Sequence, residues 1–409
     1  MPNHVTALVL SVLVLGYAVV SERVSRSFVA PALIFLILGM ALGPFGLHLL
    51  DAGPATEGYT VLAQLALTLI LFNQAAKLRF NRIREHGAVT LRLLAVGIPL
   101  TVGLGALTAA ALLPVLPWWE AVCLAAIVAP TEVALIESLI EDHRIPERVR
   151  HALSVESGFY DGFALAILLA ALGLASERSG RSDIHWIRFV VTTELYSLIV
   201  GAVIGAIGGV VVAWSRRREW MSDTWAQLAT LALAFVCFQI GEEIHASGFV
   251  AAFTGGLAFS FITRRGEDAA DGDGAVSTQV SDAAAQLLEL MVFAMFGAFA
   301  VIDGWRNADW RIVVFALVAV FAVRIVAVLV SLLGTGLPMS PRLFIGWFGP
   351  RGIGTVVLGL LVIDRGEIQH ADVIAVGVVV VVTLSLVLHS LTVAPGIRWI
   401  GAKSTTAQA

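Results

Sequence analysis

The stretch Gly349-Pro350-Arg351-Gly352-Ile353-Gly354 interrupts a long apolar block near the end of the sequence. A second stretch, Ala129-Pro130-Thr131-Glu132, interrupts an earlier apolar block. Proline removes a backbone N–H donor and glycine weakens a helix, so both blocks are predicted to unwind partway along their length. In a membrane, such backbone is tolerated only where it is buried in protein or lines a cavity. The two stretches therefore predict a pair of broken membrane helices.

The composition indicates the class of protein in which these breaks occur. Of the 409 residues, 58% are hydrophobic and 14% are charged, whereas soluble domains carry about 25% charged residues. The apolar residues form long blocks, which predicts an all-α polytopic membrane protein and excludes a soluble enzyme. The net charge of −4 and the lack of a long basic run predict no nucleic-acid partner. Cys123 and Cys237 lie inside apolar blocks, so neither a disulfide nor a zinc site is expected.

The apolar blocks divide the chain into segments of membrane-spanning length. A spanning helix needs about 20 mostly apolar residues. Residues 1–400 are therefore expected to form a single membrane transporter unit of about thirteen helices, followed by a short cytoplasmic tail, 401–409. The thirteen predicted segments are 5–22, 28–48, 58–78, 88–115, 118–141, 147–174, 186–214, 222–243, 245–263, 283–302, 310–333, 342–364 and 371–397.

The positions of the two breaks predict an internal repeat. The breaks lie in the fifth and twelfth segments, and an odd shift of seven segments reverses the direction across the membrane. Segments 1–6 and 8–13 are therefore predicted to be inverted-topology repeats, with 186–214 as the connector. Such repeats place the substrate site near the bilayer midplane, at discontinuous helices. The alternative is that the proline and the Gly-Pro pair are ordinary packing kinks.

The Lys and Arg residues predict the orientation in the membrane. If the N-terminus lies outside, the inside connections carry most of these residues, including the run Arg216-Arg217-Arg218. The positive-inside rule then predicts an external N-terminus and a cytoplasmic C-terminus in the cell (inner) membrane.

The sixth segment carries the densest group of ionisable residues, in Val155-Glu156-Ser157-Gly158-Phe159-Tyr160-Asp161-Gly162. A charge at the bilayer centre costs about 2.5–3.5 kcal/mol, so it needs a partner or a function. Ser157 and Asp161 lie one helical turn apart on one face, whereas Glu156 points to other neighbours. The carboxylate, the hydroxyl and the oxygens of the unwound Thr131 together predict an oxygen shell for a small monovalent cation.

The same carboxylate is expected to carry a proton, because burial disfavours the ionised form of an acid. Competition of H+ and Na+ for Asp161 is sufficient for coupled exchange. The structural alternative is that Asp161 only pairs with Arg351 or Arg324. For Glu156 a structural ion pair is favoured, and Arg351 in the second break is its predicted partner.

Six motifs, in order along nearly the whole chain, resemble those of the bacterial and archaeal sodium/proton antiporters of the monovalent cation:proton antiporter superfamily. They are Pro31-Ala32-Leu33-Ile34 through Gly39 and Gly43-Pro44, Ala129-Pro130-Thr131-Glu132-Val133-Ala134-Leu135, Ile145-Pro146-Glu147-Arg148-Val149-Arg150, Val155-Glu156-Ser157-Gly158, Ser247-Gly248-Phe249-Val250-Ala251-Ala252-Phe253 and Gly346-Trp347-Phe348-Gly349-Pro350-Arg351-Gly352.

The resemblance implies a thirteen-helix antiporter with a six-helix core of two crossed, broken helices and a dimerisation domain. It implies a homodimer in which the core moves like an elevator. It also implies that Asp161 is the ion-binding aspartate and that Ser157 and Thr131 supply oxygen ligands. Glu156 and Arg351 match the buried ion pair of the family.

Three positions depart from the family pattern. Glu132 stands where the family has an aspartate, and Tyr160 stands where an asparagine usually precedes Asp161; both are counted here with the ion-binding residues. In the third segment, relatives often have an acid where this chain has Asn73 and Gln74. These two residues are expected to affect cation affinity or selectivity from a second layer around the site.

The sequence thus predicts a secondary antiporter that exchanges Na+, with Li+ or K+ as alternatives, for H+ by alternating access. One binding carboxylate predicts electroneutral exchange, and no cofactor is expected. Two other hypotheses are a cation-binding or sensing homologue without turnover and a transporter of a different solute. An intramembrane enzyme is least favoured, because no Ser/His nucleophile pair lies at one depth.

Overall fold

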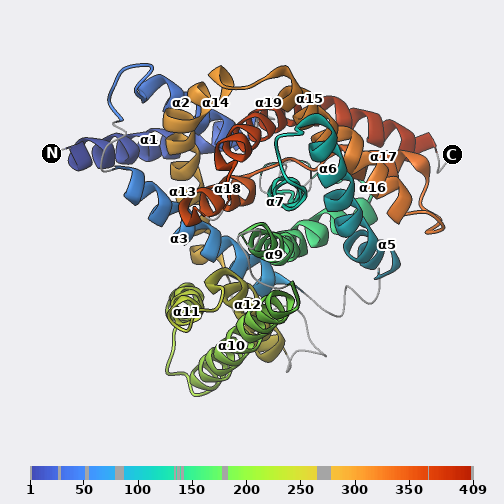
Figure 1. Cartoon of the computed structure of the whole chain (residues 1–409). Helices are drawn as coiled ribbons and strands as arrows, with labels where there is room; N and C mark the ends of the chain where they lie inside the picture. The colour runs from blue at the N-terminus through green and yellow to red at the C-terminus, as the bar shows by residue number, and fades with distance from the viewer. Residues whose placement is uncertain are drawn as a thin grey trace. The chain divides into compact units, whose positions relative to one another are not determined.

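The computed structural model describes residues 2–25, 29–50, 55–78, 87–132, 135, 139, 142–176, 183–264, 278–366 and 368–406. Regular structure in these ranges is helical (Figure 1), and the predicted all-α class is confirmed. The last part of segment 118–141 falls largely outside the described residues, as do residues 407–409 of the predicted tail. The α-helices are α1 (Pro2–Ser25), α2 (Pro31–Leu42), α3 (Ala55–Lys77), α5 (Gly87–Arg92), α6 (Ile98–Leu112), α7 (Trp118–Val128), α9 (Glu147–Ser176), α10 (Asp183–Arg217), α11 (Asp223–Glu243), α12 (Gly248–Arg264), α13 (Gln279–Phe296), α14 (Ile302–Arg306), α15 (Trp310–Leu317), α16 (Arg324–Ser331), α17 (Met339–Trp347), α18 (Ile353–Arg365) and α19 (Ala371–Thr406).

The described helices include nine that are long and apolar enough to cross a membrane. Four shorter apolar helices lie among them, at Pro31–Leu42, Trp118–Val128, Gly248–Arg264 and Ile353–Asp364. The chain is therefore a multi-pass helical protein, as predicted. The count of thirteen crossings stays a prediction, because the four shorter helices do not by themselves reach the usual spanning length.

Both predicted interruptions are confirmed. Helix α7 ends at Val128, and the backbone over 129–132 is not helical. Helix α17 ends at Trp347, residues 348–352 are not helical, and α18 begins at Ile353. Both breaks contain a proline, which cannot donate to a helical ladder. Two short helices, α17 and α18, flank the second unwound stretch, where the sequence has one continuous apolar block. At the first unwound stretch, α7 precedes the break within the described residues.

Among the described residues, three π-helical turns lie within the longer helices. They are η1 (Leu93–Gly97), between α5 and α6, η4 (Gly297–Val301), between α13 and α14, and η5 (Val318–Val323), between α15 and α16. The fourth and eleventh predicted segments thus each contain one, and α16 packs against η1. A π turn changes the direction of the side chains that follow it, which matters here because Arg324 comes directly after η5.

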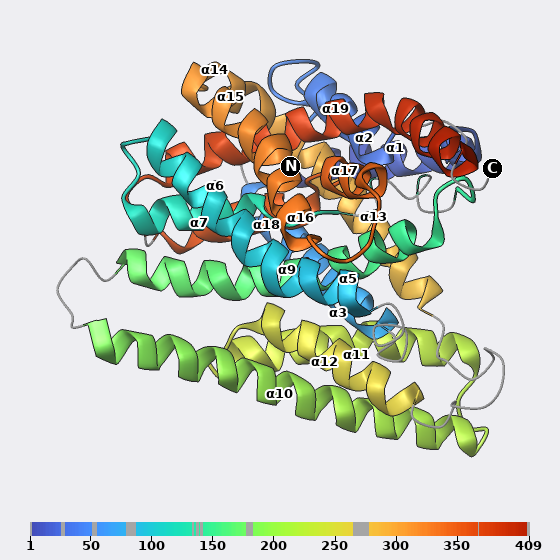
Figure 2. The ribbon, with the colours of Figure 1, turned by 90° about the vertical axis from the view of Figure 1, so that its right-hand side faces the viewer.

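The chain divides into two compact units. The first comprises Met1–Leu62, Ile83–Ser176 and Leu290–Ala409, and it contains both breaks. Within it, α7 packs against α6, α9 and α18, and α18 packs against α19 (Figure 2). The second unit comprises Ala63–Arg82 and Glu177–Glu289. The breaks and the helix with the predicted ion-binding aspartate therefore belong to one unit.

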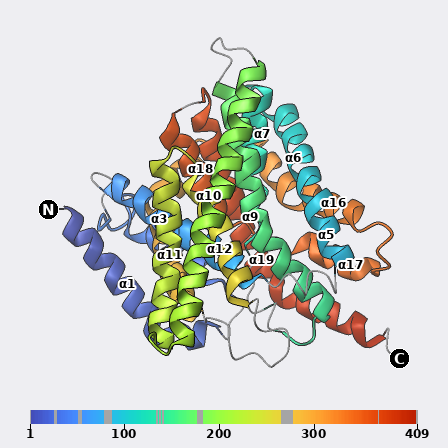
Figure 3. The ribbon, with the colours of Figure 1, turned by 90° about the horizontal axis from the view of Figure 1, so that it is seen from below.

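Small residues allow close helix packing in the second unit. Helices α10, α11 and α12 pack against one another and run alongside in Figure 3. A Cβ atom on Gly205 of α10 would overlap the backbone of Gly255 in α12, and one on Gly201 would overlap Ala251 and Thr254. Membrane helices associate through such small-residue contacts, since lipid gives no hydrophobic drive for association.

A second close approach lies in the first unit, between α2 and the α13–η4 segment. A Cβ on Gly39 would overlap the carbonyl group of Ala294, and one on Gly297 would overlap the backbone of Leu36. The glycines therefore allow the two backbones to touch directly. Any added side-chain atom must push the helices apart.

We predict that Gly39→Ala lowers the free energy of unfolding by about 1–3 kcal/mol, the usual effect of overpacking a close contact. Thermal unfolding in one detergent, followed by tryptophan fluorescence, measures the change. Gly103→Ala is the matched control, because a Cβ there meets nothing within 4 Å. An equal or smaller loss in Gly39→Ala than in Gly103→Ala would contradict the close approach.

Candidate ion-binding site

The two unwound stretches meet each other through their backbones. The Glu132 amide donates a hydrogen bond of 2.8 Å to the carbonyl of Pro350. The Arg351 amide donates to Ser385 Oγ of α19 at 2.8 Å. The Arg351 guanidinium donates to the carbonyls of Ala129 and Pro130, the latter at 3.0 Å. Protein groups thus satisfy much of the backbone that the breaks release, which membrane burial requires.

Asp161 of α9 lies where both broken segments come close. Its side chain is buried, and a Cβ placed on Gly354 would lie 2.8 Å from Asp161 Oδ1. Gly354 is in the first turn of α18, at the end where the helix dipole is positive. One turn earlier on α9, Ser157 Oγ donates to the carbonyl of Thr131 at 2.8 Å. The structure therefore brings Asp161, Ser157 and Thr131 to one place.

Glycine positions in the second break leave room for charged side chains. The Cβ and Cγ atoms of Glu132 lie where a side chain on Gly352 would be, and the Arg324 side chain lies where one on Gly349 would be. Glu132 is buried together with Thr131 in the first break. The sequence predicts Glu132 beside the ion-binding residues, and the structure places it where the two unwound stretches meet. Its role in ion binding stays a prediction.

The structure corrects the predicted partner of Glu156. Arg324, not Arg351, forms the pair: Nη1 lies 2.9 Å from Glu156 Oε1, and Nη2 lies 3.1 Å from Oε2. Both side chains are almost completely buried. Gly349 lets Arg324 pass close to the second break, while Arg351 turns to the carbonyls of the first. Two parallel hydrogen bonds make this a strong, directional pair.

Tyr160 is fully buried on α9, and the charges of Arg324, Arg351 and Glu156 act on its phenol. The structure therefore places Tyr160 beside the buried charges. Its predicted part in cation binding stays a prediction.

Asn73 and Gln74 belong to the second unit. Within that unit, Asn73 Oδ1 accepts a hydrogen bond of 2.7 Å from Ser281 Oγ of α13. The predicted influence of these two residues on cation selectivity remains a prediction.

A short turn fixes the start of α9. Asp142 Oδ1 accepts from the Arg144 amide at 2.9 Å, and the Arg144 guanidinium binds the same carboxyl. The hydrogen-bonded guanidinium of Arg144 holds the pKa of Asp142 below its usual value. This turn lies between the first break and α9, so it helps to set where α9 begins relative to that break.

Sequence reasoning missed Ser385 and His389 of α19. His389 is buried, with Nε2 2.9 Å from the Trp347 carbonyl and Nδ1 3.1 Å from Ser385 Oγ. These contacts hold the end of α17 and the Arg351 amide. The available signal was their four-residue spacing on an otherwise apolar helix, which puts both polar groups on one face.

The site is rich in oxygen ligands. In the described part of the chain, no group of three or more His, Cys, Asp or Glu side chains gathers as a metal site would. The site instead offers one aspartate, a hydroxyl and backbone oxygens, which are hard ligands. Broken membrane helices around a buried carboxylate are typical of secondary transporters.

Comparison with known proteins gives the family. The chain matches the family described as "Sodium/hydrogen exchanger, transmembrane" over residues 9–399. It therefore belongs to the sodium/hydrogen exchanger family.

The relatives include antiporters from several organisms. The chain is 27% identical over 400 residues to the K(+)/H(+) antiporter NhaP of Alkalimonas amylolytica, covering 97% of this chain and 67% of that protein. It is 26% identical over 353 residues to the Na(+)/H(+) antiporter NhaH of Halobacillus dabanensis, covering 83% of each. It is 28% identical to a probable Na(+)/H(+) antiporter of Schizosaccharomyces pombe, covering 85% of this chain and 47% of that one. The chain thus spans about two thirds of the first and less than half of the last.

A solved structure shares the fold. The sodium proton antiporter MjNhaP1 from Methanocaldococcus jannaschii at pH 8 aligns with a TM-score of 0.80 and 20% sequence identity. The alignment covers 95% of this chain and 98% of that one.

We predict that Glu156→Gln lowers the free energy of unfolding by about 3–5 kcal/mol, because Arg324 is left as an uncompensated buried charge. Adding Arg324→Gln recovers part of this loss, so the double-mutant cycle gives a large coupling energy. Unfolding in mixed detergent micelles measures each variant.

The parallel cycle with Arg351→Gln is the control, and its coupling to Glu156→Gln is smaller. A larger coupling of Glu156 to Arg351 than to Arg324 would show that the pair is assigned to the wrong arginine.

Proposed function

We propose that the protein is a secondary antiporter that exchanges a monovalent cation for H+ by alternating access, with Asp161 carrying each ion in turn. The observation that supports this most is the convergence of Asp161, Ser157 and Thr131 beside Gly354, where the two broken helices approach each other. The relatives named as K(+)/H(+) and Na(+)/H(+) antiporters support the same class of substrate.

The geometry supports a cation shell of hard oxygens. The Ser157 hydroxyl donates a hydrogen bond to the Thr131 carbonyl, which places these two oxygens together, one turn of α9 before Asp161. The Asp161 carboxylate supplies the charge, and the unwound backbone supplies further carbonyl oxygen. In this proposal Glu132 and Tyr160 border the site and shape its size. Na+ is the favoured cation, with Li+ and K+ as alternatives.

Burial supports the coupling of the two ions. An ionised Asp161 without a cation is costly in a buried site, whereas a bound cation or a bound proton neutralises it. The site then moves between the two sides of the membrane only when Asp161 holds a cation or a proton. One ion therefore replaces the other. Because one carboxylate changes state and Glu156 is already balanced by Arg324, one cation exchanges for one proton without net charge.

The same proposal covers the assembly. The breaks in the fifth and twelfth segments and the π turns in the fourth and eleventh support two inverted repeats, 1–6 and 8–13, joined by 186–214. We propose a homodimer in the cell (inner) membrane with an external N-terminus and a cytoplasmic C-terminus, in which the core moves like an elevator. Neither a cofactor nor an enzymatic activity is part of the proposal, and Asn73 and Gln74 tune selectivity, for example towards K+.

We predict that Asp161→Asn abolishes exchange, because the amide can neither balance a cation nor release a proton. Purified protein in proteoliposomes with a pH-sensitive dye and an imposed pH gradient measures the rate on addition of Na+, Li+ or K+. Ser157→Ala is expected to raise the apparent KM for the cation by about tenfold, the loss of roughly 1.4 kcal/mol of binding.

Asp223→Asn is the matched control, since this exposed carboxylate at the start of α11 belongs to the second unit and should leave the exchange rate unchanged. Exchange by Asp161→Asn at the wild-type rate would refute the site. Cation-dependent thermal stabilisation without any proton flux in the wild type would favour a sensing homologue instead.

Competition at one carboxylate also predicts the pH dependence. At pH values below the pKa of the site, the apparent KM for the cation should rise by about tenfold for each unit by which the pH falls, because one proton must leave for each cation that binds. The maximal rate at saturating cation should change much less. Initial rates over a matrix of pH and cation concentration test this, and an apparent KM independent of pH would exclude a shared site.

A further inference from the structure

The second break separates two backbone groups that a continuous helix would join. In an α-helix, the carbonyl of one residue accepts from the amide four residues later. Trp347 is the last residue of α17, and Arg351 stands four residues after it, within the unwound stretch. Because the Arg351 amide donates to Ser385 instead, the helical bond between Arg351 and Trp347 is missing.

Helix α19 offers a partner to each of these two groups. Ser385 Oγ accepts from the Arg351 amide at 2.8 Å, and His389 Nε2 lies 2.9 Å from the Trp347 carbonyl oxygen. Ser385 and His389 are one helical turn apart, and Ser385 Oγ lies 3.1 Å from His389 Nδ1. The two side chains therefore form a continuous path from one end of the break to the other.

Two aromatic rings hold the imidazole of His389 in place. Phe321, in η5, stacks on it with the ring centroids 5.7 Å apart and the planes at 22°. Phe348 packs against it more nearly edge-on, with the centroids 6.3 Å apart and the planes at 60°. Rotation of the imidazole away from its polar contacts would therefore displace an aromatic neighbour.

The position of one proton decides how this path works. A neutral imidazole has one N–H and one bare nitrogen. With the proton on Nε2, the ring donates to the Trp347 carbonyl and Nδ1 accepts from the Ser385 hydroxyl. With the proton on Nδ1, the ring donates to the Ser385 carbonyl, 2.8 Å away in the helical ladder of α19. Nε2 would then face the Trp347 oxygen without a hydrogen between them.

We propose that Ser385 and His389, the latter neutral with its proton on Nε2, are positioning residues that hold the second break. The Arg351 amide donates to Ser385, the Ser385 hydroxyl donates to His389, and His389 donates to the Trp347 carbonyl. This relay of three hydrogen bonds takes the place of the one helical bond that the break removes. It satisfies both backbone groups inside the membrane, where water cannot do so.

The relay acts on the ion-binding site through the backbone of the second break. Arg351 directly follows Pro350, whose carbonyl accepts from the Glu132 amide of the first break. Three residues after Arg351, Gly354 lies beside Asp161 Oδ1. A shift of Arg351 therefore moves both the junction of the two breaks and the start of α18 beside Asp161. This effect on exchange rests on the proposed function, whereas the relay itself does not.

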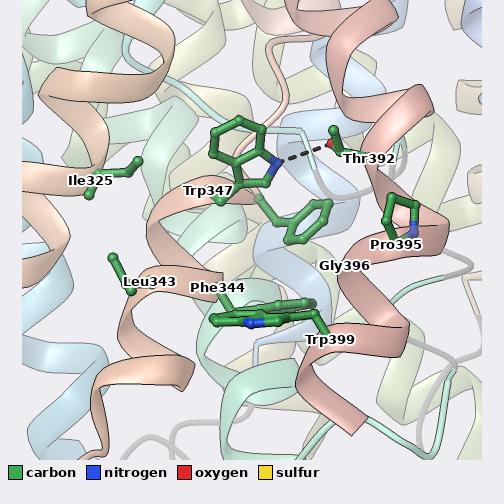
Figure 4. A pocket seen from close by; sticks show the side chains of 9 residues that line it. Ile325, Leu343, Phe344, Trp347, Thr392, Pro395, Gly396 and Trp399 are labelled. Atoms are coloured by element: carbon green, nitrogen blue, oxygen red, sulfur yellow. Dashed lines mark hydrogen bonds between the residues drawn. The ribbon is translucent and has the colours of Figure 1, made fainter. Parts of the chain in front are cut away.

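A third polar residue of α19, Thr392, offers a matched control. Its Oγ1 accepts from Nε1 of the Trp347 indole at 3.1 Å, the bond drawn in Figure 4. The indole lines an apolar groove of about 390 Å³ between α16, α17 and α19, beside Pro395 and Gly396. Thr392 thus holds the side chain of Trp347, whereas the relay holds the backbone on both sides of the break.

NMR measures the protonation of the ring without transport. The full-length protein, labelled with heavy nitrogen in its histidine rings, is reconstituted in lipid bilayers at neutral pH. Subtraction of the spectrum of His389→Gln leaves the two ring signals of His389. A protonated Nε2 and a bare Nδ1 are expected. A proton on Nδ1 alone, or on both nitrogens, would overturn the relay.

The exchange assay in proteoliposomes tests the positioning role. His389→Leu and Ser385→Ala are each expected to raise the apparent KM for the cation by about tenfold, equivalent to about 1.4 kcal/mol of binding. The maximal rate per folded protein should change much less, whereas a loss of folded protein alone would lower that of the preparation and leave KM unchanged. His389→Gln should recover part of the affinity, because its amide can still donate to the Trp347 carbonyl. Thr392→Val should keep the wild-type KM.

A wild-type KM in Ser385→Ala and His389→Leu, or an equal rise in Thr392→Val, would overturn the positioning role. If His389→Leu does not fold, Ser385→Ala and the NMR of the wild type decide the question. Absent exchange in the wild type with the expected ring signals would refute the proposed function and leave the relay intact. Normal exchange with an unchanged KM in the relay variants would refute the positioning role and leave the proposed function intact.

Discussion

The hydrogen bond from the Glu132 amide to the Pro350 carbonyl joins the two interrupted helices, and the site depends on this junction. A broken helix in a membrane exposes N–H and C=O groups that hydrocarbon cannot satisfy. Here each break supplies partners for the other: Pro350 accepts from Glu132, and Arg351 donates to Ala129 and Pro130. Unwinding thus leaves backbone groups that need hydrogen-bond partners, and it also releases carbonyl oxygens that a cation could bind.

The balance of buried charge follows from this junction. Arg324 and Glu156 form a bidentate pair that is closed to solvent, so neither needs to change its protonation for the pair to be stable. Arg351 is held by carbonyl oxygens of the first break. Asp161, one turn from Ser157 and beside the start of α18, is the carboxylate to which the proposed exchange assigns the change of charge. Glu156 of the structural pair and the proposed carrier Asp161 lie on the same helix, five residues apart, and face different neighbours.

The sequence was sufficient for the membrane class, the family, the two breaks and the grouping of Asp161, Ser157 and Thr131. The membrane class, the breaks and the shared face of Ser157 and Asp161 depend on local information: apolar length, proline and glycine within a block, and the four-residue period of a helix. The family rested on the resemblance of six motifs in order along the chain, and the place of Thr131 on the unwinding of the first break. The partner of Glu156 could not be obtained in this way. It depends on the direction in which Arg324 leaves the π turn η5 and on the space that Gly349 leaves beside it. Neither can be read from spacing, and Arg351 was the plausible choice only because it lies in a break. The groove beside Pro395 and Gly396 was missed for the same reason, because a hollow depends on three helices at once.

The glycines of the second break connect these findings. Gly349, Gly352 and Gly354 each stand where a side chain would overlap a charged residue, namely Arg324, Glu132 and Asp161. Substitution of any one would displace a charge as well as backbone. These glycines weaken the helix. They also let three ionisable side chains, one each from α16, the first break and α9, approach the same short stretch of main chain. A continuous helix with ordinary side chains would keep those groups apart, and the closed Glu156–Arg324 pair and the buried Asp161 could not both lie against it. The second break therefore has two consequences: it lets ionisable side chains pack inside the membrane, and it supplies oxygen ligands.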